Sequence, residues 1–98
     1  MKIIWTLRAL KTYFKVSDYL QEEWGETVVR NFALEVEKVI GEMQSHPKMF
    51  EVSKRFKNVR KGCVTEHNTL FYRIKPRKKE IELLIFWDNR QDDKKRQY

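Results

Sequence analysis

VRKGCVTEHNTLFYRIKPRKKEIELLIFWD, residues 59–88, is the stretch that decides the fold. Its apolar residues recur with a period of two, which is typical of β-strands. We therefore predict strands at Val59–Thr65, Thr69–Lys75 and Ile81–Trp87. His67-Asn68 separates the first two strands, and the turn Pro76–Lys79 separates the last two. Such short links predict an antiparallel meander.

The last of these strands is apolar on both faces. One alternating set is Ile81, Leu83, Ile85 and Trp87, and the other is Glu82, Leu84, Phe86 and Asp88. Because both sets contain large apolar residues at mid-strand, we expect this strand to lie in the centre of the sheet rather than at an edge.

Before residue 59 the apolar period changes to that of helices. Lys2–Trp5 is predicted as a short strand, and Thr6 is a suitable N-cap for the helix that follows it. Gly25 is expected to end that helix. Its expected buried face is Leu7, Leu10, Phe14, Ser17, Leu20 and Trp24.

A second helix is predicted from about Glu26 to Gln44, and His46-Pro47 should stop it. Its apolar stripe is Val28, Phe32, Val36, Val39, Ile40 and Met43. A polar connector, Lys48–Asn58, then leads to the first strand of the meander. Its expected anchors are Met49, Phe50, Val52 and Phe56.

The order of predicted elements is strand, helix, helix and three strands. Each helix must bury one apolar face, and a sheet face is the surface available for this. We therefore expect an α+β fold of β-α-α-β-β-β order, with a helical hairpin on one face of a small antiparallel sheet. The other sheet face should stay open and, through strand twist, slightly concave. Residues 1–98 are expected to form a single domain with a polar tail at about 89–98.

Charge is unevenly distributed along the chain. Residues 1–45 carry six Lys and Arg against seven Asp and Glu, whereas residues 46–98 carry fifteen against seven. A basic second half suggests an acidic partner, either a nucleic acid or an acidic protein segment. A solvated surface that only maintains solubility is the alternative.

The composition also restricts the location and the cofactors. No apolar run approaches the roughly 20 residues of a membrane-spanning helix, and the apolar start before Arg8 is too short for a secretion signal. The single cysteine, Cys63, has no partner for an internal disulfide. We therefore expect a cytoplasmic protein that does not bind membranes. His and Cys lack the spacing of metal ligands, and neither a metal nor a small-molecule cofactor is expected.

Several local patterns, taken in order, resemble the RelE/ParE superfamily of toxins, and in particular its ParE-like or plasmid-stabilisation-type members. The patterns are Trp5-Thr6, Tyr19-Leu20 followed by Trp24-Gly25, Pro47 after the second helix, Val59-Arg60-Lys61, Leu70–Ile74 and Ile85–Asp92. Each pattern alone is common, but their order and spacing together are characteristic of the superfamily. The resemblance covers nearly the whole chain.

The resemblance implies the toxin of a type II toxin–antitoxin module, which inhibits growth until a cognate antitoxin neutralises it. RelE-like members cut messenger RNA in the decoding site of the ribosome, whereas ParE-like members poison DNA gyrase. A protein-binding module without toxicity is a third possibility. The fold alone cannot choose among these functions.

Carried over residue by residue, the pattern of the RNA-cutting members matches only in part. Arg60 and Arg90 occupy its first and last basic positions, but Gly62 and Thr69 stand at two others, and Trp87 stands where some members have histidine. These losses favour a ParE-like gyrase inhibitor that is not an enzyme. A metal-independent, ribosome-dependent messenger endoribonuclease is the alternative, with its catalytic groups drawn from Arg60, Lys61, His67, Arg73 and Arg90.

Four cations are candidate contacts with a phosphate or with the target: Arg60, Lys61, Arg73 and Arg90. Arg60 and Arg73 are expected on the same sheet face of adjacent strands, where paired guanidinium groups suit a carboxylate or a phosphate. A solvent-facing sheet with scattered cations is the alternative. The runs Arg77–Lys79 and Lys94–Arg96 are better interpreted as a turn tip and a solvated tail.

Three further side chains have a chemical and a structural interpretation. His67 can be a general base, although a turn histidine is more often only solvated. Cys63 can be a nucleophile, although no base is placed beside it, and a small buried residue is the simpler interpretation. Tyr72 is expected to pack rather than to act as an acid.

Overall fold

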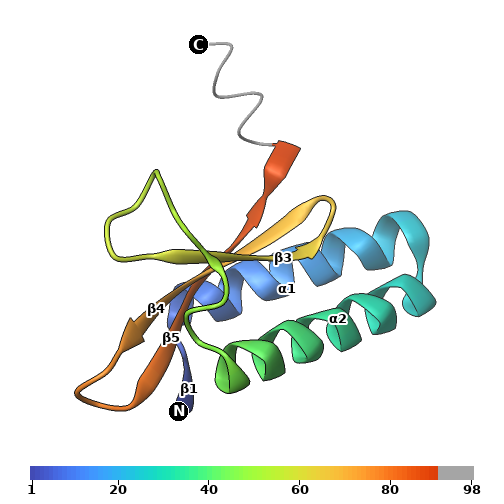
Figure 1. Cartoon of the computed structure of the whole chain (residues 1–98). Helices are drawn as coiled ribbons and strands as arrows, with labels where there is room; N and C mark the ends of the chain where they lie inside the picture. Colours follow the sequence, from blue (N-terminus) through green and yellow to red (C-terminus); the bar gives the residue numbers. More distant parts are fainter. Residues whose placement is uncertain (91–98) are drawn as a thin grey trace.

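The computed structural model describes residues 1–90, and within this range it contains two helices and a five-stranded sheet (Figure 1). The elements are β1 (Lys2–Trp5), α1 (Leu7–Trp24), α2 (Glu26–Ser45), β2 (Glu51–Val52), β3 (Arg60–Thr65), β4 (Asn68–Lys75) and β5 (Glu80–Asp88). Every element predicted from the sequence is present, and its bounds agree to within one residue. The predicted tail beyond residue 90, including Lys94–Arg96, lies outside the described residues.

The strand order is β1-β5-β4-β3-β2. The predicted meander is confirmed, because β3, β4 and β5 pair antiparallel, and β5 is an interior strand. The expectation of an all-antiparallel sheet is wrong, since β1 pairs with β5 in parallel and the sheet is therefore mixed. The short β1 occupies the free side of β5, with Lys2 opposite Glu80. The two-residue β2, inside the connector, was not predicted.

An extra residue interrupts the alternation of β5. Phe71 on β4 pairs with Ile85 and the next residue, Tyr72, pairs with Leu83, so Leu84 has no partner on β4 and forms a β-bulge. The bulge reverses the alternation of side chains in the second half of β5, so that each residue there points to the sheet face opposite to the one that simple alternation predicts. Leu83 therefore lies in the core beneath the helices, whereas Ile85 and the following apolar residue Trp87 belong to a cluster on the opposite face.

Two threonines, the N-cap of α1 and one in its second turn, form hydrogen bonds with the backbone beside this bulge. The Thr6 hydroxyl donates to the carbonyl oxygen of Leu83 at 2.7 Å, and it also caps α1 by accepting from the amide of Ala9 at 3.1 Å. The amide of Phe86 donates to the Thr12 hydroxyl at 2.9 Å. These contacts hold the start of α1 against β5 and fix the position of the helix along this strand.

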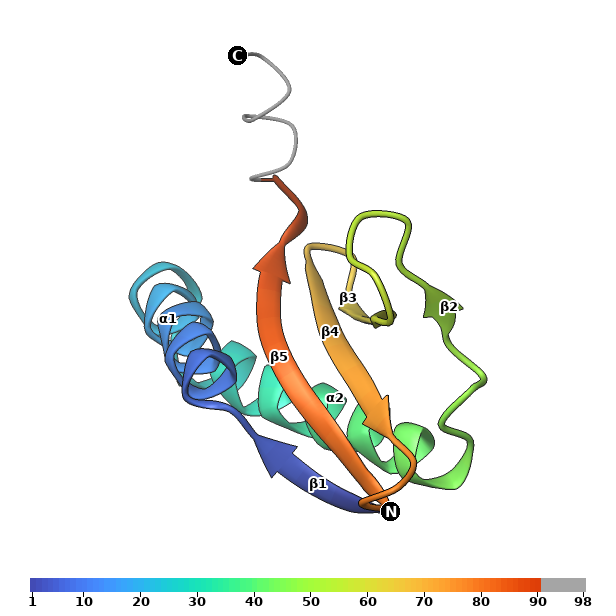
Figure 2. The same cartoon turned by 90° about the vertical axis from the view of Figure 1, so that its left-hand side faces the viewer.

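Both helices cover the same face of the sheet, as Figure 2 shows from the side that they leave uncovered. Gly25, at φ 90°, makes the turn between them, a conformation that suits glycine because it lacks a Cβ. Neither helix of residues 1–90 is both long enough and apolar enough to cross a membrane. The buried core beneath them consists of Ala9, Phe32, Val36, Val39, Met43, Val64, Leu70, Tyr72, Ile81, Leu83 and Phe86.

The predicted stripe of α2 is confirmed except at Val28, but the predicted face of α1 is wrong except at Leu20. Leu7, Phe14 and Trp24 are 57–68% exposed. The residues of α1 that meet the core are Ala9, Tyr13, Val16 and Leu20. Two apolar stripes run along α1. The stripe that contains the small Ala9 faces β5, since a small side chain allows the close approach that the Thr6 and Thr12 hydrogen bonds require.

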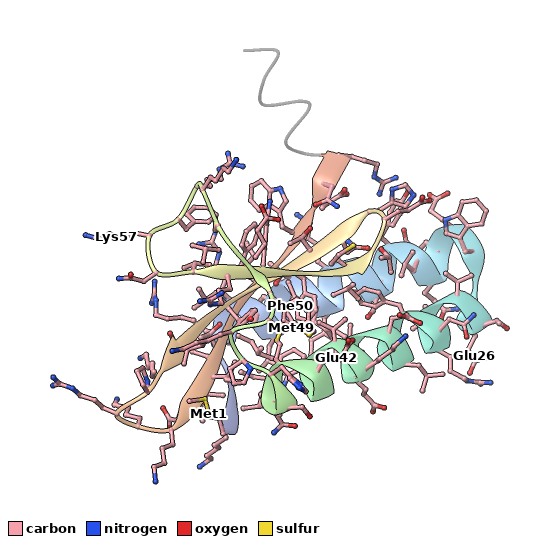
Figure 3. All side chains as sticks on the ribbon, in the orientation of Figure 1. Met1, Glu26, Glu42, Met49, Phe50 and Lys57 are labelled. Atoms are coloured by element: carbon pink, nitrogen blue, oxygen red, sulfur yellow. The ribbon has the colours of Figure 1, made fainter. Side chains whose placement is uncertain are left out.

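The sheet face away from the helices is only partly open. Phe71 and Trp87 form a second small cluster with Val59, and the connector folds over it, placing the ring of Phe56 5.4 Å from that of Phe71. Of the predicted anchors, Phe50 packs on the main core and Phe56 contacts the second cluster while remaining 39% exposed, whereas Met49 and Val52 are 55% and 53% exposed. Figure 3 shows how the connector extends beyond the sheet at Lys57.

Replacing Thr6 by alanine removes the helix cap and the hydrogen bond to Leu83 together. We expect the free energy of unfolding to fall by about 1–2 kcal/mol, measured by urea denaturation followed by circular dichroism. Thr6→Ser keeps the hydroxyl and is the matched control, with a much smaller loss expected. An alanine variant as stable as the parent protein would contradict this role of the hydroxyl.

Candidate functional site

Arg60 points to the helix-covered side of the sheet, at the edge where β3 begins. It pairs with Tyr72 on β4, which lies in the core. Its Nη1 donates to the carbonyl oxygens of Phe50 at 2.7 Å and Lys48 at 3.2 Å. The guanidinium therefore holds the connector against the sheet through the two N–H donors of Nη1, out of its five.

Arg73 lies on the opposite face from Arg60, so the prediction that the two share a face is wrong. Arg60 is in register with Tyr72, and Arg73 is the next residue along β4, so its side chain points to the other face. There Nη1 of Arg73 lies 3.6 Å from the carboxylate of Glu82, which also contacts Nζ of Lys75 at 3.3 Å. The sequence could not reveal this, because the phase between strands depends on the register.

Lys61 shares the open face with Arg73. It is in register with Phe71, two residues before Arg73, which makes the two cations diagonal neighbours on adjacent strands. Lys61 is 3.8 Å from Glu51 on β2, and the two side chains are 40% and 63% exposed. Solvent screens such a pair strongly, so both cations remain accessible to an acidic partner.

Arg90 and His67 lie together at the far end of the sheet from Arg60. The Arg90 guanidinium donates to both carboxylate oxygens of Asp88, at 3.1 and 3.2 Å, and stacks 5.5 Å from the ring centre of Tyr19. Burial opposes the ionisation of Asp88, but hydrogen bonds and charge from Arg90 outweigh it and lower the pKa of this carboxyl. His67 is an exposed turn residue, and its Nε2 lies 3.2 Å from Glu66.

Tyr19 is a contact of this group that the sequence analysis did not predict. It lies on α1, and with Trp24 and Arg90 it lines a surface hollow of about 840 Å³ between the helices and the β3–β4 turn. The signal in the sequence that could have indicated Tyr19 was its position as an aromatic residue outside the apolar face of the helix. A second hollow, of about 920 Å³, lies beside the connector, and Arg60 and Arg73 both line it.

The structure thus divides the predicted site residues between the two ends of the sheet, with Arg60 and Arg73 at the hollow beside the connector and His67 and Arg90 at the other hollow. Arg60 lies at the connector, Lys61 and Arg73 on the open sheet face, and His67 and Arg90 by the β3–β4 turn. Within residues 1–90, no three His, Cys, Asp or Glu side chains form a group that could hold a metal ion.

Gly62 and Thr69 each have a structural role at their positions. A Cβ added to Gly62 would lie 3.1 Å from the Cε of Met43 and 3.2 Å from the Cγ1 of Val39, so this strand position is closed by α2. The hydroxyl of Thr69 lies 2.8 Å from the Oδ1 of Asn89. A basic side chain at residue 62 would have to displace core side chains.

Both Tyr72 and Cys63 were predicted to be buried, and only Tyr72 is. Tyr72 packs in the core as expected, and its hydroxyl donates to the Pro47 carbonyl at 2.7 Å. Burial raises the pKa of Tyr72 to about 12, against a smaller opposing effect of the Arg60 charge. The prediction of a buried Cys63 is wrong. The thiol lies exposed on the open face and donates to the carbonyl of Thr65 at 3.1 Å, since the connector does not reach it.

Comparison with known proteins gives a family and a set of similar structures. A family model described as the ParE toxin of the type II toxin–antitoxin system parDE matches residues 3–93. A search of curated protein sequences gives no match.

Three solved structures show the similarity of fold. The chromosomal ParDE system of P. aeruginosa superposes with a TM-score of 0.75 at 18% identity, over 90% of this chain and 95% of that one. A YoeB/ParE toxin from Agrobacterium tumefaciens gives 0.68 at 14%, over 91% and 99%. The intact E. coli RelBE toxin–antitoxin complex gives 0.62 at 16%, over 89% and 94%. The predicted superfamily and fold are confirmed.

The phenol of Tyr72 is expected to remain neutral throughout the physiological range. Because its pKa is raised to about 12 in the folded chain, the stabilisation from its neutral form is complete below the unfolded pKa near 10. It is lost as the pH rises through about 12. Ultraviolet titration of phenolate should show one tyrosine that ionises last, and Tyr72→Phe should remove that phase. A Tyr72→Phe variant that keeps the phase would contradict the assignment.

Proposed function

Because this chain belongs to the ParE toxin family of type II toxin–antitoxin systems, we propose that it arrests growth by inhibiting DNA gyrase and that it does not cut RNA. The observation that supports this most is the placement of its cations. Arg60 donates to connector carbonyls, and Arg90 pairs with Asp88 at the other end of the sheet. Contacts within the chain hold both groups, and they do not lie on one surface.

Cutting RNA at a 2′-hydroxyl requires groups that act together on one phosphate. A base, an acid and donors for the developing charge must all lie within hydrogen-bond reach. A positioned acid or base contributes about 10²–10⁴-fold, and one charge-stabilising donor about 10²–10³-fold. With Gly62 closed by α2, and with the Tyr72 side chain buried and its hydroxyl bonded to the Pro47 carbonyl, this chain is expected to fall short of a ribonuclease by several such factors.

The open sheet face is the surface that we propose for binding the target. Lys61 and Arg73 are diagonal neighbours there, and Lys75 lies beside Arg73 at Glu82. Their carboxylate partners Glu51 and Glu82 are intramolecular, so an acidic surface of the target can compete for the same cations. Binding through exposed charge needs no assembled catalytic centre, which agrees with the dispersed arrangement.

We further propose that the chain acts in the cytoplasm and that a cognate antitoxin neutralises it. Solved structures of similar fold include complexes of a toxin with its antitoxin, among them RelBE from E. coli. The net charge of +7 favours an acidic antitoxin segment that folds on binding. Such a segment can cover a large part of a small toxin from a short length of chain.

Gyrase inhibition is tested by adding the purified chain to a supercoiling reaction and, in parallel, to programmed ribosomes that carry a messenger. We expect supercoiling to be inhibited while the messenger stays intact. The double variant Lys61→Glu/Arg73→Glu should weaken inhibition at least about 10-fold, because both cations of the proposed surface are reversed.

The matched control is Arg30→Glu, an exposed cation on α2, which should inhibit as the parent does. Messenger cut in the decoding site and abolished by Arg60→Ala or Arg90→Ala would replace the proposal with the ribonuclease. Growth arrest with neither effect would place the target outside both activities.

The antitoxin is tested by copurification with the product of the adjacent gene. We expect a tight complex and rescue of growth, with association that slows as ionic strength rises, because opposite charges steer the encounter. Stopped-flow mixing over about 0.05–0.5 M salt gives the dependence. An adjacent product that neither binds nor restores growth would remove this part of the proposal.

A further inference from the structure

The outward face of α1 carries an apolar stripe that residues 1–90 leave partly exposed. Leu7, Leu10 and Phe14 are 68%, 38% and 57% exposed. They recur at steps of three and four residues, so they lie along one side of the helix, beside the stripe of Ala9 and Tyr13 that meets the core, and the Phe14 ring lies 5.5 Å from that of Tyr13. Exposed apolar side chains gathered along one helix face mark an interaction surface.

Charges beside this stripe are sorted by sign along the helix. The first half of α1 contains three cations, Arg8, Lys11 and Lys15, and the second half contains three carboxylates, Asp18, Glu22 and Glu23. All six residues are exposed. Lys11 and Asp18 are seven residues apart, two helical turns, and therefore lie on the same side as Phe14.

This arrangement is unfavourable within one isolated helix. Cations near the N-terminus and carboxylates near the C-terminus both oppose the helix dipole, at roughly 0.3–1 kcal/mol each. Lys11 and Lys15, like Asp18 and Glu22, are like charges four residues apart, which repel each other by roughly 0.2–0.5 kcal/mol, and the attraction of Lys15 for Asp18, three residues on, offsets only one of these repulsions. Among residues 1–90, no ion pair joins any of these side chains to an opposite charge.

We propose that α1 is a homodimer interface, in which the helix packs antiparallel against α1 of a second copy of this chain. A two-fold axis close to Phe14 places each basic half beside the acidic half of the other copy. Each Lys11 then faces the partner's Asp18, and symmetry produces this pair twice. The apolar contact at the centre is Phe14 against the same residue of the second copy.

The charge pattern selects a second copy over other occupants. A surface whose basic and acidic halves are related by the two-fold operation is complementary to itself, which is the property that an isologous interface requires. An acidic antitoxin segment along the same helix would be attracted by Lys11 but repelled by Asp18 and Glu22. The inference is independent of gyrase, since α1 lies on the helix side and Lys61 and Arg73 lie on the opposite sheet face.

The dimer should be weak and sensitive to salt. The helix is about 27 Å long, and only a narrow stripe of it is apolar, so the buried area lies at the small end of specific interfaces. We expect a dissociation constant in the micromolar range. Sedimentation velocity of the purified full chain, from about 1 to 500 µM, measures it.

Charge reversal separates this interface from non-specific association. Lys11→Glu and Asp18→Lys should each weaken dimerisation about 10-fold, because each replaces two attractions by two repulsions. The double variant Lys11→Glu/Asp18→Lys should return to within about 3-fold of the parent, because the pairs are restored with reversed sign. Phe14→Glu should weaken it most.

The control is Leu34→Glu, which adds a carboxylate at an exposed apolar residue of α2 and should dimerise as the parent does. Circular dichroism and thermal unfolding establish that each variant is folded. A parent chain that sediments as a monomer up to about 500 µM would overturn the proposal. So would a folded double variant that stays as weak as the single ones, or a Leu34→Glu variant as weak as Phe14→Glu.

Discussion

The bulge at Leu84 in β5 is the constraint on which the rest of the structure depends. It shifts the strand by one residue, so that Leu83 and Phe86 enter the core while Ile85 and Trp87 face the other side. The hydrogen bonds from Thr6 and to Thr12 fix α1 at the same point. The outward-facing residues give the connector a surface to fold onto. The folded connector then presents the carbonyl groups that Arg60 holds.

This chain of contacts explains why the basic character of the protein does not amount to a catalytic centre. Arg60 holds the connector, and Arg90 closes the end of β5 against Tyr19 at the other end of the sheet. Both are placed by packing that also stabilises the fold, and Arg90 lies apart from the hollow that Arg60 and Arg73 line. What remains available is charge for binding, spread over the open sheet face and along α1.

The sequence was sufficient for the elements, because alternation, helical periodicity, Gly25 and Pro47 are local signals. It was insufficient wherever the face that a side chain occupies depends on the register between strands or on a bulge. Alternation cannot show the extra residue at Leu84, and so it assigned Ile85 to the wrong face. Periodicity selected one apolar stripe on α1, but the stripe of the small Ala9 packs on the sheet instead, through close contacts that spacing does not record. The separation of Arg60 from Arg73, and the contact of Arg90 with Tyr19, likewise arise from register and long-range packing.

The central claim is that contacts within the fold occupy the arginines that a ribonuclease would need for binding RNA. Nuclear magnetic resonance of the arginine side chains tests this most directly, by comparing guanidinium proton exchange at Arg60 with that at Arg77, an exposed residue of the β4–β5 turn. We predict slow exchange at Arg60, fast exchange at Arg77, and no shift of the Arg60 signals when a messenger oligonucleotide is added. Fast exchange at Arg60, with signals that move and saturate as the oligonucleotide is titrated, would contradict the claim.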